Sequence, residues 1–308
     1  MGLTLITGAS GFVGSHLVAD MKKRDMPLRA VSRSSGQDTL RISSYDADTD
    51  WTPYLADVDT VVHLAARVHI MRETETDPLA AFRRANVDAT INLVQQASKA
   101  GVKRFVYMST VKVHGEETQV GKPFSISDLP DPKDPYAISK AEAEAALKEI
   151  SKQTGLEVTI IRPPLVYGRG VGGNFALLMK LAKIGLPSIF AAIRNRRSII
   201  YVGNLTDFVI RAIGHPLAAN RTYLVSDGIP LSTHRIYVEL SGAYGRAPLG
   251  IHVPNICLKV AGAIAFRGDQ MRRLVNNLEV DDSDARSELS WEERYSTKKA
   301  MQLTTTRS

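Results

Sequence analysis

The sequence predicts an α/β protein in which a doubly wound parallel sheet is joined to a smaller mixed α/β lobe. Through the first half of the 308 residues, apolar strand-like runs alternate with helical patterns. Such alternation is typical of a parallel sheet with helices on both faces. After residue 167 a glycine-rich stretch, residues 168–173, interrupts the alternation, so we expect the second lobe to begin there.

The expected elements follow from the period of the apolar residues. Short apolar runs predict strands over residues 3–6, 28–32, 60–64, 105–109 and 158–162. Helical spacing predicts helices over residues 12–21, 78–100 and 135–154. Further along we expect a helix over 174–183 and strands over 198–201 and 222–225, the second returning to the main sheet. We also expect a buried or half-buried helix over 256–266, too short to span a bilayer, and a loose tail over the last dozen residues.

Composition and charge exclude several classes of protein. The chain is 44% hydrophobic and 23% charged, as in an ordinary soluble protein. Its single cysteine, Cys257, excludes an internal disulfide framework and a multi-cysteine metal site, and we expect it to be packed. The net charge of +7 is scattered apart from clusters at 194–197 and 272–273, which suit a small phosphorylated ligand better than nucleic acid. Without a secretory signal or a membrane-spanning segment, we expect a cytoplasmic protein.

A glycine-spaced turn, Thr-Gly-Ala-Ser-Gly-Phe-Val-Gly over residues 7–14, follows the first strand and opens the first helix. Helix starts present free N–H groups and the positive end of the helix dipole, which suits a pyrophosphate. The glycines permit a tight turn and close approach of the phosphates. The spacing G-x-x-G-x-x-G is one residue longer than the common dinucleotide fingerprint. Alone, it is also compatible with a turn that only packs a helix on a sheet.

Tyr136 and Lys140 lie four residues apart, on one face of the predicted helix 135–154. An ammonium beside a phenol favours the phenolate, so we expect Lys140 to lower the pKa of Tyr136 toward the range that proton transfer requires. Thr110, at the end of a neighbouring strand, can hydrogen-bond the same substrate oxygen. If only the four-residue spacing is considered, Tyr136 and Lys140 could equally be a pair on the helix surface without a function.

Taken in order, these motifs resemble the extended short-chain dehydrogenase/reductases that act on nucleotide sugars. The motifs that carry the resemblance are residues 7–14, His63-Leu64-Ala65-Ala66, Asn86, Met108-Ser109-Thr110, Tyr136 to Lys140, and Arg162 to Gly168. Weaker similarities continue at 197–202 and 289–291. The resemblance implies a Rossmann-type dinucleotide-binding domain of residues 1–166 and 198–228, and a nucleotide-sugar lobe of residues 167–197 and 229–308.

The resemblance also implies roles for individual residues. Tyr136 is the implied general acid/base, Lys140 holds the nicotinamide ribose and tunes Tyr136, and Thr110 orients the sugar oxygen. Asn174 and Arg197 are implied to bind the substrate's nucleotide and diphosphate, with Arg272 or Arg273 as a further candidate. For Asn174, capping of a helix is an almost equally good interpretation. The implied cofactor contacts are Gly8, Ser10, Gly11, Phe12, Val13, Gly14, Arg33, Ser34, Leu64, Ala65, Ala66, Tyr136, Lys140 and Pro163.

Three departures from the family pattern refine the expectation. Arg33 follows the second strand where NAD-preferring members carry an acid, which favours NADP through its 2′-phosphate, although stacking of Arg33 on adenine keeps NAD open. Val111 and Lys112 replace the Asp-Glu pair of sugar dehydratases, so dehydration is not expected. His114 stands where tyrosine is usual, without an evident interpretation.

What remains is redox chemistry at a sugar carbon, which we expect to be C4. Because of Arg33, the first expectation is NADP(H)-dependent reduction of a UDP-linked 4-keto sugar. The sequence around residues 65–71 and 195–198 also resembles that of bacterial reductases of UDP-4-keto-6-deoxy-N-acetylhexosamines. The alternative is a UDP-hexose 4-epimerase that keeps NAD tightly bound. A non-catalytic protein that senses NADP is the third hypothesis. The family resemblance also allows a homodimer formed through the long helices.

Overall fold

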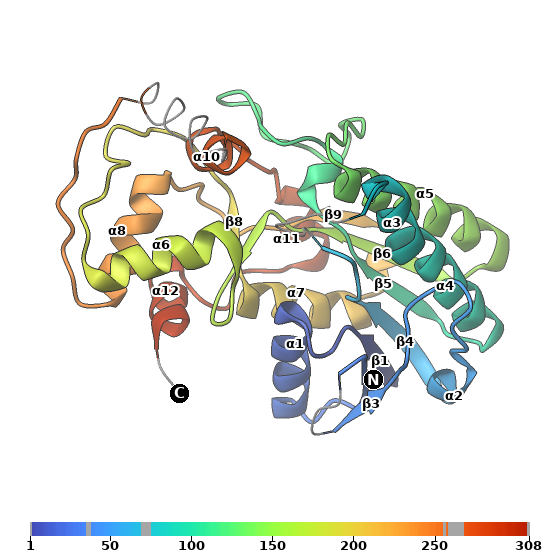
Figure 1. The fold of residues 1–308 in the computed structure, drawn as a ribbon. Helices are drawn as coiled ribbons and strands as arrows, with labels where there is room; N and C mark the ends of the chain where they lie inside the picture. The colour runs from blue at the N-terminus through green and yellow to red at the C-terminus, as the bar shows by residue number, and fades with distance from the viewer. Residues whose placement is uncertain (1, 35–37, 69–74, 255–256, 258–267, 307–308) are drawn as a thin grey trace.

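The computed structural model describes residues 2–34, 38–68, 75–254, 257 and 268–306. Its centre is a seven-stranded sheet in the order β3-β2-β1-β4-β5-β6-β9, with every neighbouring pair parallel (Figure 1). The strand order reverses between β1 and β4, and such a switch point opens a crevice at the carboxyl ends of the strands. The strands are β1 (Leu3–Thr7), β2 (Leu28–Ser32), β3 (Thr39–Arg41), β4 (Val58–His63), β5 (Arg104–Met108), β6 (Glu157–Arg162) and β9 (Thr222–Leu224).

Helices cover both faces of this sheet (Figure 1). Because side chains alternate along a strand, Leu5 and Ile6 of β1 enter separate hydrophobic cores. Ile6 packs in the core with Leu17 of α1, and Leu5 packs in the core with Leu147 of α5. The covering helices are α1 (Phe12–Lys23), α7 (Val202–Gly214) and α11 (Ser283–Leu289) around the first core, and α2 (Thr52–Leu55), α4 (Ala89–Lys99) and α5 (Pro135–Thr154) around the second.

Helix α5 begins and ends where its sequence dictates. The Asp134 carboxylate accepts a hydrogen bond from the Ala137 N–H at 2.7 Å and caps the helix start, and Pro135 occupies the first turn. At the other end Gly155 adopts a left-handed conformation, with φ of 75°, which stops the helix. The helix predicted over residues 135–154 is confirmed at both ends.

The second lobe is built on a two-stranded parallel sheet of β7 (Leu165–Tyr167) and β8 (Ile199–Tyr201). Its core contains Tyr167, Phe175 and Tyr237. The lobe helices are α6 (Gly173–Ile184), α8 (Thr233–Ala243), α10 (Gly268–Val275) and α12 (Thr297–Thr305). Helix α12 corrects the prediction of a loose tail, because Ala300 and Met301 are buried in the lobe core. Their short apolar stripe is hidden among threonines and lysines in the sequence.

Most other sequence-based expectations are confirmed, with local corrections. The main strands and α6 appear where expected, and β9 joins the main sheet beside β6. The expected helix 78–100 is formed by α3 (Pro78–Arg83), a π-helical segment η1 (Arg84–Asp88) and α4. Cys257 is exposed, so its predicted packing is wrong, while the rest of the expected helix 256–266 lies outside the described residues. The short 3-10 turns are η2 (Val111–Val113) and η3 (Pro216–Ala218).

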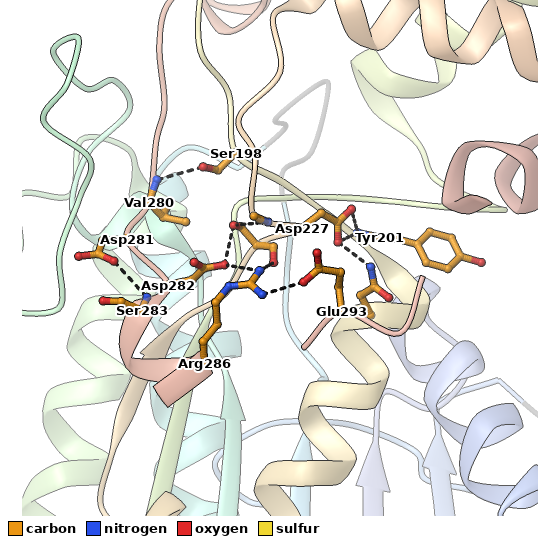
Figure 2. Close-up of polar contacts among 12 residues, drawn as sticks. Ser198, Tyr201, Asp227, Val280, Asp281, Asp282, Ser283, Arg286 and Glu293 are labelled. Atoms are coloured by element: carbon orange, nitrogen blue, oxygen red, sulfur yellow. Dashed lines mark hydrogen bonds and ion pairs between the residues drawn. The ribbon is translucent and has the colours of Figure 1, made fainter. Parts of the chain in front are cut away.

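Polar contacts join the lobe to the carboxyl end of the sheet (Figure 2). The buried Asp227 carboxylate accepts hydrogen bonds from the Tyr201 N–H at 3.0 and 3.1 Å and from the Asn204 amide at 2.8 Å. Burial raises the pKa of Asp227 to about 6. Nearby, Arg286 of α11 binds Glu293 at 2.7 Å and Asp282 at 3.1 Å. These contacts fix β8 and the start of α7 next to the crevice.

Candidate active site

A cavity of about 1120 Å³ lies at the carboxyl ends of the strands. It is lined by the turn between β1 and α1, by segments that follow β2, β4, β5 and β6, and by the first turn of α5. All of the residues predicted to contact a cofactor line this cavity, and so does Thr110. The described lining carries the cationic residues Arg33, Arg67 and Lys140 and no aspartate or glutamate.

Close packing explains the glycines of the β1–α1 turn. A Cβ built on Gly14 lies 2.2 Å from the Gly8 carbonyl oxygen, and one built on Gly8 lies 2.7 Å from the Ala65 nitrogen. Gly8 also has a φ of 68°, which disfavours a side chain. Gly11 caps α1 and offers no side-chain acceptor to the N–H groups of the first turn. The turn therefore brings bare backbone to the cavity at a helix start, as binding of a phosphate requires.

Lys140 is buried beneath the cavity, with an exposed fraction of 2%. Its ammonium lies 4.1 Å from the centre of the Tyr107 ring, and no described carboxylate lies within ion-pair distance of it. Burial lowers the pKa of Lys140 to about 7, against the opposing effect of the negative charge on Glu144. Lys140 therefore changes its protonation near neutral pH.

The direction of the Tyr136 pKa corrects the sequence-based expectation. Burial, followed by the negative charge of Asp134, raises the pKa of Tyr136 well above its usual value, whereas we expected Lys140 to lower it. The physical reason is that Tyr136 is half-buried and Lys140 is buried at the cavity wall, and desolvation disfavours the charged form of each. Tyr136 therefore favours its neutral form, whose hydroxyl can donate a proton, while Lys140 exchanges its proton near neutral pH.

A buried ion pair lies directly behind these residues. Glu144, one turn after Lys140 on α5, binds Arg162 at the end of β6 through two contacts of 2.5 and 2.9 Å. It also accepts a hydrogen bond of 2.5 Å from the Ser109 hydroxyl. Ser109 precedes Thr110, and Arg162 precedes Pro163, whose carbonyl accepts the Val111 N–H at 3.0 Å. One carboxylate thus fixes the three segments that carry Lys140, Thr110 and Pro163.

The same ion pair explains His114, which the sequence left uninterpreted. The Nη1 of Arg162 lies 2.7 Å from Nε2 of His114. Because a guanidinium can only donate, Nε2 must be the acceptor and the proton lies on Nδ1. Burial, and then the charge of Arg162, lowers the pKa of His114 to about 4, and its ring stacks on Phe124. His114 is therefore a neutral support for Arg162.

Asn86 fixes another wall of the cavity from within the π-helical segment η1. Its side-chain oxygen accepts the Arg67 N–H at 2.7 Å, and its amide donates to the Arg67 carbonyl at 3.0 Å and to the Ser139 hydroxyl at 3.0 Å. Asn86 thereby ties the segment after β4 to the residue beside Lys140 on α5. A π-helical segment often marks such a functional position, because it redirects one side chain from a regular helix.

Comparison with known proteins agrees with this geometry. Residues 4–226 match the model of the NAD dependent epimerase/dehydratase family. A UDP-glucose 4-epimerase from Vibrio cholerae is 40% identical over 294 residues, which cover 93% of this chain and 89% of that protein. The chain belongs to the NAD dependent epimerase/dehydratase family.

Solved structures show the same fold. The UDP-N-acetylglucosamine 4-epimerase from Bacillus cereus aligns with a TM-score of 0.81 at 22% identity, over 98% of this chain and 97% of that one. RMD from Pseudomonas aeruginosa, complexed with NADPH, aligns with a TM-score of 0.75 at 21% identity, over 98% of both chains. This family member is thus an NAD(P)-dependent enzyme of the extended short-chain dehydrogenase/reductase type.

The predicted substrate residues other than Thr110 lie outside the large cavity. Arg197 is buried and donates to the Asn276 carbonyl at 2.9 Å. Arg272 and Arg273 line a smaller cavity of about 370 Å³ together with His114. Asn174 lies in the first turn of α6, but Gly172 is the capping residue, so the capping interpretation of Asn174 is wrong.

Tyr45 is the clearest site residue that sequence reasoning missed. Its hydroxyl donates to the Val31 carbonyl at 2.9 Å and accepts the Gly8 N–H at 3.3 Å, so it braces the glycine turn at the cavity wall. Burial raises its pKa to about 12, so it stays protonated. Tyr45 follows the short strand β3 in an irregular segment without a motif, which explains why it gave no signal. Among the described residues no group of histidines, cysteines and acids is placed to bind a metal.

Proposed function

We propose that the protein is a UDP-hexose 4-epimerase that acts on UDP-glucose or UDP-N-acetylglucosamine. The observation that carries this proposal is one cavity that brings Thr110, Tyr136 and Lys140 to the same space as the glycine turn. The substrate class comes from the 40% identical Vibrio cholerae relative. This proposal replaces the reductase as the first candidate, because the relatives favour the alternative.

The large cavity fits a dinucleotide. It is lined by bare glycine backbone at a helix start, by Arg33 and Ser34 at the end of β2, and by Tyr136 and Lys140. NAD held there would supply reversible hydride transfer at C4 of the sugar, which inverts this carbon when the hydride returns to the opposite face of the transient ketone. Tyr136 would exchange a proton with the oxygen on C4, Thr110 would hydrogen-bond that oxygen, and Lys140 would receive or supply the proton that Tyr136 moves.

Arg197 supports a diphosphate-bearing substrate. It is a buried cation that makes no ion pair with the described residues, and burial, together with repulsion by Arg273, lowers its pKa to about 10. An unpaired buried cation is costly, and an anion offsets that cost. We therefore propose that the diphosphate of the substrate lies between Arg197 and Arg273.

A second candidate is NADP(H)-dependent reduction of a UDP-linked 4-keto sugar. The observation that favours it is Arg33, which is exposed at the cavity where its guanidinium can pair with a 2′-phosphate. The described lining holds no carboxylate that would repel this phosphate. In the epimerase, Arg33 would lie on the adenine ring of NAD. For either activity, Lys112 is engaged with Asp134 and supplies no acid for dehydration.

Two assays separate the candidates. Purified protein is incubated with UDP-glucose or UDP-N-acetylglucosamine, and the galacto isomer is measured by NMR. In parallel, NADPH absorbance is followed with UDP-linked 4-keto sugars. Formation of the isomer without net NADPH oxidation supports the epimerase. NADPH oxidation without isomer formation supports the reductase, and binding of NADP without either reaction supports a sensor.

The acid/base assignment has its own test. Replacing Tyr136 by Phe should abolish turnover and leave cofactor binding intact, as measured by titration calorimetry. The matched control is Tyr54→Phe, because the Tyr54 hydroxyl donates to the Arg41 carbonyl outside the cavity. Turnover that survives in Tyr136→Phe at the wild-type rate would remove Tyr136 from its proposed role.

A further inference from the structure

A surface with no assigned role lies at the edge of the second lobe. Here the turn after α6 lies beside the loop after α8: the Ser188 N–H donates to the Leu249 carbonyl at 2.8 Å, and the Ile251 N–H donates to the Ser188 carbonyl at 2.8 Å. The Tyr237 hydroxyl anchors the turn through a hydrogen bond of 2.7 Å to the Leu186 carbonyl. Two segments far apart in sequence therefore form one ordered surface.

This surface exposes large aliphatic side chains. Their exposed fractions are 64% for Ile184, 46% for Leu186, 39% for Ile189, 77% for Leu249 and 47% for Ile251. Single exposed aliphatic residues are common, but here five are gathered on two segments that are hydrogen-bonded to each other. We call these five residues the lobe edge.

The two segments that carry the lobe edge contain positively charged residues and no negatively charged ones. Residues 168–206 and 240–268 contain no aspartate or glutamate. Lys180 and Lys183 precede the turn on α6, and a Cβ on Gly185 would lie 2.8 Å from Nη1 of Arg246, so Arg246 packs against the turn. None of these three cations makes an ion pair within the described part of the chain. The nearest acid on the neighbouring helix α8, Glu239, is already paired with Arg235 at 2.6 Å.

We propose that the lobe edge docks the protein on an anionic lipid bilayer. Exposed aliphatic side chains enter the boundary between headgroups and acyl chains, and adjacent lysines and arginines are attracted by the negative headgroups. The lobe edge offers both, and its cations have no competing partners. The carboxyl ends of α6 and α8 lie on the side of the molecule away from the seven-stranded sheet (Figure 1), so docking leaves the sheet free.

Sedimentation with vesicles tests this proposal on the full chain. Wild-type protein should bind vesicles of phosphatidylcholine mixed with phosphatidylglycerol, should not bind phosphatidylcholine alone, and should lose binding at high salt. The double variant Ile184→Glu/Leu249→Glu should bind at least tenfold more weakly, since it removes two apolar contacts and adds two negative charges near the headgroups. The matched control is Leu129→Glu/Leu217→Glu, which changes two exposed leucines elsewhere and gives the same net charge.

Other outcomes overturn the proposal. Equal binding of the mixed vesicles by both double variants would show that the lobe edge does not contact lipid. A wild-type protein that sediments with neither vesicle would exclude docking. If the lobe-edge variant turns a dimer into a monomer, measured by analytical ultracentrifugation, while vesicle binding stays unchanged, the surface is a contact between two copies of the chain. Circular dichroism of both variants confirms that loss of binding does not come from unfolding.

Discussion

Replacing Lys140 by Met should change how the stability of the protein depends on pH. Burial lowers the pKa of Lys140 from 10.5 to about 7 in the folded state. Between these values the unfolded chain binds one more proton, so the free energy of unfolding rises with pH by up to about 1.4 kcal/mol per pH unit. Above pH 10.5 Lys140 is largely neutral in the folded and the unfolded chain, so the gain in unfolding free energy is nearly complete. This gain is lost as the pH falls toward 7. Over the whole interval it amounts to roughly 5 kcal/mol.

The assay is urea denaturation of wild type and Lys140→Met at several pH values without cofactor. The difference between the two unfolding free energies isolates Lys140, because other titrating groups are common to both proteins. From pH 9.5 down to pH 7, Lys140→Met should gain about 3 kcal/mol relative to wild type. The control is Lys148→Met, which removes an exposed lysine from the same helix. A difference that stays constant across this interval would refute a lowered Lys140 pKa.

Three further outcomes are expected. Glu144→Gln leaves the buried Arg162 without a negative charge beside it and should cost about 3–5 kcal/mol in urea denaturation. Glu157→Gln should cost about 1 kcal/mol or less, because the Glu157 side chain is 41% exposed and Arg104 keeps its backbone carbonyl acceptors; equal costs would contradict the buried pair. Gly14→Ala places a Cβ 2.2 Å from the Gly8 carbonyl and should abolish cofactor binding in a titration, while Gly242→Ala, with open space around it, should not. Arg33→Ser should weaken NADP binding about tenfold or more and change NAD binding less; a uniform change would assign Arg33 to the adenine.

The sequence predicted the fold well where local signals agree. Asp134, Pro135 and Gly155 mark the ends of α5, and the alternation of apolar runs gives every central strand of the sheet. The residues that the family resemblance implies as cofactor contacts line one cavity, because the carboxyl ends of parallel strands meet at one edge. This physical rule places the glycine turn, Thr110 and Pro163 together without knowledge of their contacts.

The remaining features depend on contacts between segments far apart in sequence. The bracing of Gly8 by Tyr45, 37 residues away, gives no local pattern. The pKa of Tyr136 has the opposite direction to the expectation, because the spacing to Lys140 is visible in the sequence and the burial of both groups is not. His114 became interpretable only when the structure placed its ring beside Arg162.

The most direct measurement follows the hydrogen on C4 of the sugar. UDP-glucose carrying deuterium at C4 is incubated with the purified protein in ordinary water, and the UDP-galactose formed is analysed by mass spectrometry and NMR. Hydride transfer within the Tyr136 cavity predicts that the deuterium stays on C4 of the product. An isomer whose C4 hydrogen comes from water would contradict a hydride mechanism in this cavity. Formation of deuterated UDP-galactose by Tyr136→Phe at the wild-type rate would contradict it too.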